Sequence, residues 1–195
     1  MMKFKWTSYN ISRLKFLITL LIIGIIIGFI IYYRQDDLIK ASITHEMTNL
    51  KEIISSTRQN NFLYHFLLLA ALLIFSLIVV GLPIILFYFF YEGISLGFLL
   101  AGFFHYQGWQ GLLFGLVFTL INKLIFYLGL VYLVLVSIRY AQKMIVALKN
   151  KDLRINEYLV NHLIKILFGT GIILIYDVFL YFWGNKLLTH FLFLF

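Results

Sequence analysis

The sequence of 195 residues contains no cysteine and one proline, and only 12% of its residues are charged. Without cysteine, the chain can form no disulfide, no thiolate metal site and no thiol nucleophile. Soluble domains are about one quarter charged. A single soluble core of this length could not bury the apolar residues, which make up 63% of the chain. These deficits exclude a cytosolic enzyme, a DNA-binding module and a disordered tail.

Long apolar runs occupy most of the chain, and the mean hydropathy is +0.97. A hydrocarbon layer about 30 Å thick takes about 20 apolar residues per helical crossing. The first run is too long for a cleaved signal peptide and is interpreted as a retained anchor. We predict an all-α, polytopic transmembrane bundle of about five crossings. Residues 1–195 form one integral membrane domain in this prediction, with helices near 14–33, 62–81, 84–104, 112–138 and 159–183.

The apolar stretch from 62 to 104 is long enough for two crossings and must contain a break. One candidate is Gly81-Leu82-Pro83 and the other is Tyr91-Glu92-Gly93. Proline removes a backbone donor and glycine loosens a helix. We therefore prefer Gly81 and Pro83 as the break, and the second position stays open.

Two polar segments suggest the topology. Residues 35–61 are charge-balanced when Arg34 is included and have apolar residues at helical spacing, which predicts an amphipathic extracytoplasmic segment. Residues 139–157 are basic, as is the N-terminal segment with Lys3, Lys5, Arg13 and Lys15. Because basic loops stay in the cytoplasm, we expect the bacterial cytoplasmic membrane, with the N-terminus inside and the C-terminus outside.

The formal net charge of +8 is then mainly topological. Membrane lipid with anionic head groups is the expected partner of the basic segments, and no nucleic acid is expected. Aromatic side chains beside the apolar runs are predicted to anchor the helices at the two interfaces. These anchors are Tyr32, Tyr33, Trp109 and Trp183.

Four polar side chains stand inside the apolar runs or at their edges, namely Glu92, Asn122, Lys123 and Asp177. A charge at the bilayer centre costs at least about 2.5 kcal/mol, so such groups should face one another or a wet cavity. We expect Lys123 to pair with Glu92 or Asp177. The four residues form an internal polar clamp on one interpretation and line a transport path on the other.

Small residues at four-residue spacing occur in three of the predicted helices. Such spacing places them on one helix face, where another backbone can approach closely. Internal packing and docking of a partner helix both fit this pattern. The glycines concerned are Gly24, Gly28, Gly93, Gly97, Gly111 and Gly115.

The sequence contains no recognisable catalytic constellation. The five histidines are scattered over different segments and lack the HExxH spacing, so no metal site is expected. Ser76, Ser95 and Ser137 lack the GxSxG motif of a serine hydrolase. We therefore predict no catalytic residue and no cofactor.

The stretch from 81 to 126 resembles the centre of the stage II sporulation protein M family. The similarity rests on the break at Gly81-Leu82-Pro83, on Gly93 and Gly97-Phe98, and on Gly108-Trp109 with Gly111 behind them. Asn122 stands where the family tends to carry an asparagine, and Asp177 where it often has a glutamate. The family pattern has prolines around that asparagine, whereas this chain has Leu120, Ile121 and Lys123.

This resemblance implies a non-enzymatic membrane scaffold. Such a scaffold would anchor and localise peptidoglycan-degrading enzymes at the septum or cell envelope during sporulation engulfment. Its partners would be stage II sporulation proteins D and P or other cell-wall hydrolases, and a homo-oligomer stays open. The alternative is a small transporter or channel that uses Glu92, Lys123 and Asp177. A lipid-modifying enzyme would need a polar cluster at one membrane interface. The sequence has only scattered candidates for such a cluster, such as His105 and Gln107.

Overall fold

The computed structural model describes residues 8–49, 62–78, 81–150 and 154–192. The described residues form helices and their connections and contain no strand, so the all-α prediction is confirmed. The helices are α1 (Ser8–Tyr33), α2 (Asp37–Thr48), α4 (Phe62–Leu77), α5 (Leu82–Lys149) and α6 (Ile155–Leu192).

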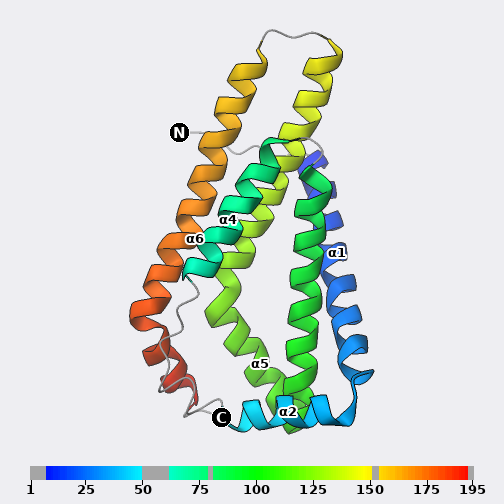
Figure 1. The fold of residues 1–195 in the computed structure, drawn as a ribbon, viewed down its shortest axis with the longest axis vertical. Coiled ribbons are helices and arrows are strands. Elements are labelled where there is room, and N and C mark those ends of the chain that lie inside the picture. The colour runs from blue at the N-terminus through cyan, green and yellow to red at the C-terminus, as the bar shows by residue number, and fades with distance from the viewer. Residues whose placement is uncertain (1–7, 50–61, 79–80, 151–153, 193–195) are drawn as a thin grey trace.

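Helix α5 is a hairpin of two helical arms. A straight helix of its 68 residues would be about 100 Å long, roughly three times the hydrocarbon thickness. Its path reverses at Gln107 (φ −133°, ψ 19°) and Gly108 (φ 59°, ψ −136°). The two arms then run side by side in opposite directions (Figure 1). Sequence analysis placed a longer loop between 104 and 112, whereas the helix continues up to these two residues and resumes directly after them.

The connection between α4 and α5 lies next to the only proline of the chain. Helix α4 ends at Leu77, and α5 begins at Leu82 with Pro83 in its first turn. Proline suits this place because its fixed φ is helical and the first-turn amides need no partner within the helix. A Cβ on Gly81 would lie 1.9 Å from the Phe75 carbonyl oxygen, so the chain can fold back here only with glycine. The alternative break, at Tyr91-Glu92-Gly93, lies inside α5.

Among the residues that the structure describes, three helices are long and apolar enough to cross a membrane, namely Ile11–Tyr33, Leu82–Lys149 and Ile155–Trp183. The described apolar part of α4, Phe66–Leu77, is shorter. In Figure 1, α1, the first arm of α5 and α6 run one way, and α4 and the second arm of α5 run the other. Helix α2 lies across the end of the bundle where α5 reverses.

The outside of the bundle is as apolar as its core. Phe89, Phe126 and Ile173 are almost completely buried between α5 and its neighbours. Large apolar side chains also point outward, among them Phe168 (65% exposed) and Ile175 (72%). Water would penalise such a surface and lipid would not, which is the arrangement of a membrane protein.

The two polar segments are more helical than a loop interpretation implies. Helix α2 accounts for 37–48 of the predicted segment 35–61, and it has no buried residue. The remainder, 50–61, lies outside the described residues. In the predicted basic loop 139–157, α5 continues to Lys149 and α6 begins at Ile155. Lys3 and Lys5 also lie outside the described residues.

Candidate functional site

A buried ion pair joins the two arms of α5. Lys123 Nζ on the second arm lies 3.5 Å from Glu92 Oε2 on the first. Glu92 is 5% exposed, and the Tyr88 hydroxyl donates a 2.5 Å hydrogen bond to its other carboxylate oxygen. Lys123 keeps about a third of its side chain exposed. Both carboxylate oxygens therefore have donors, as a buried carboxylate requires.

The other two residues of the predicted clamp take different positions. The Asn122 amide donates to the Phe118 carbonyl oxygen (3.0 Å), one turn earlier in its own helix. Asp177 is buried on α6. Its neighbour Tyr176 donates to the Ile121 carbonyl oxygen, which ties α6 to the second arm of α5. The structure thus brings Glu92 and Lys123 together, while Asn122 bonds to its own helix.

The glycines of α1 and of the first arm of α5 face one another. A Cβ on Gly28 would lie 2.2 Å from the Ile94 carbonyl oxygen, and one on Gly97 would lie 2.1 Å from that of Ile25. Gly24 and Gly93 meet in the same way, since a Cβ on Gly24 would lie 3.1 Å from Gly93 Cα and one on Gly93 would lie 3.3 Å from Gly24 Cα. These four glycines serve internal helix packing, because the faces that could have received a partner helix already hold α1 and α5.

Gly111 and Gly115 close the α5 hairpin. A Cβ on Gly111 would lie 2.0 Å from the Phe103 carbonyl oxygen, and one on Gly115 would lie 2.6 Å from the Phe103 ring. That ring also packs edge-on against Phe114 at 5.4 Å. The second arm can lean on the first immediately after the turn because these two positions have no side chain.

Only part of the predicted aromatic set lies on the outside. Tyr33, Trp109 and Trp183 are 47%, 73% and 52% exposed, respectively. Tyr32 is fully buried, with its ring 5.3 Å from Phe98 and 5.8 Å from His105. Neighbouring residues of a helix point about 100° apart, so Tyr32 faces the bundle while Tyr33 faces outward.

Sequence analysis missed a cap on the end of α4. The last carbonyls of a helix lack partners within it. His162 Nε2 of α6 donates to the Ser76 carbonyl oxygen (3.0 Å), and the Tyr140 hydroxyl of α5 donates to that of Leu77 (3.3 Å). The two rings stack at 3.9 Å. No local sequence pattern predicts this cap, because the residues that form it come from three different helices.

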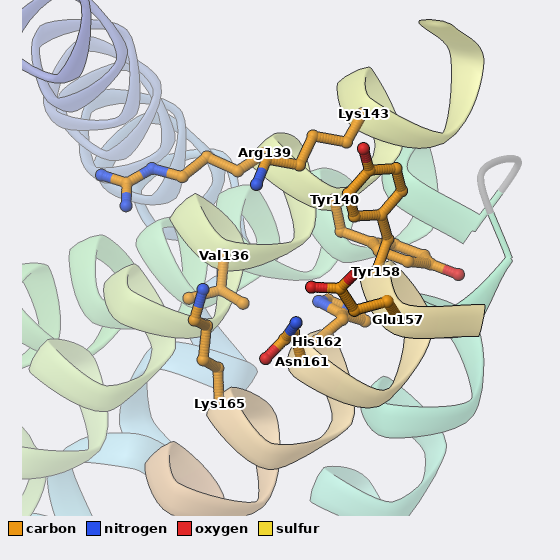
Figure 2. Close-up of a pocket in the computed structure, with 9 residues that line it drawn as sticks. All are labelled: Val136, Arg139, Tyr140, Lys143, Glu157, Tyr158, Asn161, His162 and Lys165. Carbon is orange, nitrogen blue, oxygen red and sulfur yellow. The ribbon is translucent and has the colours of Figure 1, made fainter. Parts of the chain in front are cut away.

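A pocket opens beside this cap, between the end of α5 and the start of α6 (Figure 2). Its volume is about 330 Å³, a size at the lower end of small-ligand sites. The lining is largely polar and carries three basic residues. It consists of Val136, Arg139, Tyr140, Lys143, Glu157, Tyr158, Asn161, His162 and Lys165.

Within the described ranges, no three histidine, aspartate or glutamate side chains gather closely enough to hold a metal ion. Buried polar side chains such as Glu92, Ser137 and His162 instead bond to one another or to backbone carbonyl oxygens. Chemically, the arrangement can lock helices in register and can receive a polar group in the pocket between α5 and α6.

Comparison with known proteins identifies the family. A family model described as Stage II sporulation protein M matches residues 17–182, which include most of α1 and all of α2, α4 and α5. No curated protein and no solved structure gives a significant match. The matched residues cover most of the chain and include the turn, the packed glycines and the ion pair. The chain belongs to the stage II sporulation protein M family, a family of sporulation-related membrane proteins.

Proposed function

We propose that this protein is a non-enzymatic, multi-pass scaffold in the bacterial cytoplasmic membrane that holds peptidoglycan-degrading enzymes at the septum or envelope during engulfment. The family match over residues 17–182 carries this proposal. Stage II sporulation proteins D and P, or other cell-wall hydrolases, are the proposed partners. The internal use of the glycines and of the Glu92–Lys123 pair favours a packed scaffold over a transport path.

The proposed topology has five crossings, namely α1, α4, the two arms of α5, and α6. The basic residues Arg139 and Lys143 belong to the same end of the bundle as Arg13, since the Arg13 guanidinium bonds to the Gln142 side chain across α1 and α5. Positive charge gathered at one end supports placing that end in the cytoplasm. The opposite end, with α2 and the α5 turn, then faces the cell wall.

Helix α2 offers the extracytoplasmic surface for the partners. Its inner side packs on α5, where the Met47 and Ile43 side chains reach the position of Gly102. Leu38 on its outer side is 85% exposed, more than any other large apolar residue among those described. An exposed leucine at the proposed wall-facing end is suited to contact another protein.

The test is recovery of the partners with a tagged full-length chain from sporulating cells. Leu38→Glu should reduce recovery of proteins D and P at least five-fold, because a charge would enter the proposed apolar contact. The protein level in the membrane should stay unchanged, because Leu38 is 85% exposed and contributes little to the packing of the bundle.

Leu148→Glu is the matched control, because Leu148 is 58% exposed and lies near the opposite end of the second α5 arm. It introduces the same change and should leave recovery intact. Equal recovery of proteins D and P with the native chain and with both variants would show that α2 is not the docking surface. Absence of proteins D and P from the native chain's purification would contradict the scaffold proposal itself.

A further inference from the structure

The pocket between α5 and α6 has a charge pattern that the packing of the bundle does not require. Figure 2 shows Lys143 reaching toward the pocket from α5 and Lys165 from α6, while the Arg139 guanidinium extends away from it. The Lys143 ammonium also lies 5.6 Å from the centre of the Tyr158 ring. Two lysines from different helices thus flank one hollow, which suits a phosphate group.

The opposite wall of the pocket includes hydrogen-bond acceptors. Glu157 and Asn161 line it. His162 is 97% buried there, and its Nδ1 has no hydrogen-bond partner in the described structure. Because the Ser76 carbonyl oxygen can only accept, Nε2 carries a proton, and in the neutral ring Nδ1 is an acceptor. Protein atoms cover Nδ1, so a ligand in the pocket that donates hydrogen bonds reaches the exposed Glu157 carboxylate instead.

An apolar stripe continues from the pocket along α6. Asn161, Lys165, Phe168, Ile172 and Ile175 follow one another at alternating spacings of four and three, so they share one helix face. The three apolar members are 65%, 43% and 72% exposed, respectively. A ligand that binds in the pocket and has long apolar chains could therefore lay them along this face.

We propose that the pocket binds the headgroup of an anionic, hydroxyl-bearing phospholipid of the phosphatidylglycerol type. Lys143 and Lys165 hold the phosphate, and the glycerol hydroxyls donate to the Glu157 carboxylate. The acyl chains run along Phe168, Ile172 and Ile175. Basic pockets between membrane helices are known places for such headgroups. The site would serve in either leaflet, so it does not depend on the proposed orientation.

The first experiment counts lipids bound to the purified full-length chain by native mass spectrometry. The chain is offered equal amounts of phosphatidylglycerol and phosphatidylcholine. The native chain should retain phosphatidylglycerol at least ten-fold better. Lys143→Gln with Lys165→Gln should lose that preference at least five-fold.

The control variant is Lys15→Gln with Lys149→Gln, which removes the same charge from two exposed lysines outside the pocket lining. It should keep the preference. If both double variants lost the preference for phosphatidylglycerol equally, general charge attraction would explain the binding. That result would overturn the proposed site. Retention by the pocket variant would overturn it as well.

The second experiment uses the native chain alone, so it stands even if the pocket variant fails to fold. Phosphatidic acid, which is anionic but lacks the headgroup glycerol, should bind at least three-fold more weakly than phosphatidylglycerol. Equal binding would overturn the role of the hydroxyls. Phosphatidylethanolamine should not compete, and its equal retention would overturn the requirement for a net negative headgroup.

A third experiment distinguishes binding of a lipid from binding of a free phosphate. Glycerol phosphate or inorganic phosphate at millimolar concentration should leave bound phosphatidylglycerol in place, because neither has acyl chains for the α6 stripe. Displacement by either would assign the pocket to a soluble phosphate compound and overturn the lipid proposal.

Discussion

Glu92 and Lys123 show how single charges are retained inside an apolar bundle. An isolated charge in hydrocarbon is costly, but the Glu92 carboxylate has Lys123 on one oxygen and Tyr88 on the other. The lysine keeps partial exposure and so loses less hydration than the buried acid. Sequence reasoning anticipated this pair because the chain has few charges in its apolar runs. The choice of Glu92 depended on the α5 hairpin.

Removal of the lysine should destabilise the bundle. Lys123→Met leaves the buried Glu92 carboxylate without its cation and should cost about 1–3 kcal/mol of unfolding free energy. Adding Glu92→Gln in the same chain should restore most of that loss, because no uncompensated charge then stays buried. Thermal unfolding in detergent measures both. A double variant no more stable than the single one would contradict the pairing, and loss of an ion flux with unchanged stability would favour a transporter.

The glycines at four-residue spacing also change meaning once the structure is known. The spacing alone fits both internal packing and partner docking. Gly97 faces the Ile25 carbonyl and Gly28 that of Ile94, so replacing Gly93 and Gly97 by leucine should separate α1 from α5. Protein level and partner recovery should then fall together, whereas loss of partner recovery at an unchanged protein level would indicate a docking face.

At the scale of elements, α5 depends on one unusual backbone conformation. Gly108 has φ 59° and ψ −136°, which is a region nearly restricted to glycine. Nothing lies within 4 Å of a Cβ built there. The residue is therefore required by backbone conformation alone. Sequence analysis placed a connection here from its glycines and aromatics, but not a two-residue reversal between helical arms.

Gly108→Ala should lower the unfolding free energy by about 1–3 kcal/mol, because alanine strains the turn although space is free. Gly171→Ala is the matched control, since a Cβ there also meets nothing within 4 Å and the residue lies inside α6. It should be neutral or stabilising by up to about 1 kcal/mol, as alanine favours helix. Resistance to denaturing detergent ranks the two variants. Equal behaviour would show that the turn tolerates a side chain.

At the scale of the whole molecule, the two ends of the bundle differ in charge. Arg13, Lys143 and the adjoining ends of α5 and α6 lie at one end, while α2 and the reversal of α5 lie at the other (Figure 1). This difference underlies the proposed orientation, with the basic end in the cytoplasm.

Because the chain contains no cysteine, single cysteines can report its orientation without background. We expect His45→Cys on α2 to react with a membrane-impermeant maleimide in intact cells. Lys149→Cys at the end of α5 should react only after permeabilisation, because the membrane shields that end. The unmodified chain is the blank. The opposite labelling pattern would invert the proposed topology, and labelling of both positions in intact cells would contradict an odd number of crossings between them.

The sequence by itself determined the all-α class, the membrane environment and the resemblance to the family, because apolar run length and residue order are properties of the linear chain. Tertiary structure decided which acid meets Lys123, that α1 and α5 occupy each other's glycine faces, and that Tyr32 turns inward. It also built the α4 cap and the pocket from residues such as Ser76, Tyr140 and His162, which lie on three helices. Contacts between distant segments depend on how helices pack, and helical periodicity within one segment carries no information about its neighbour.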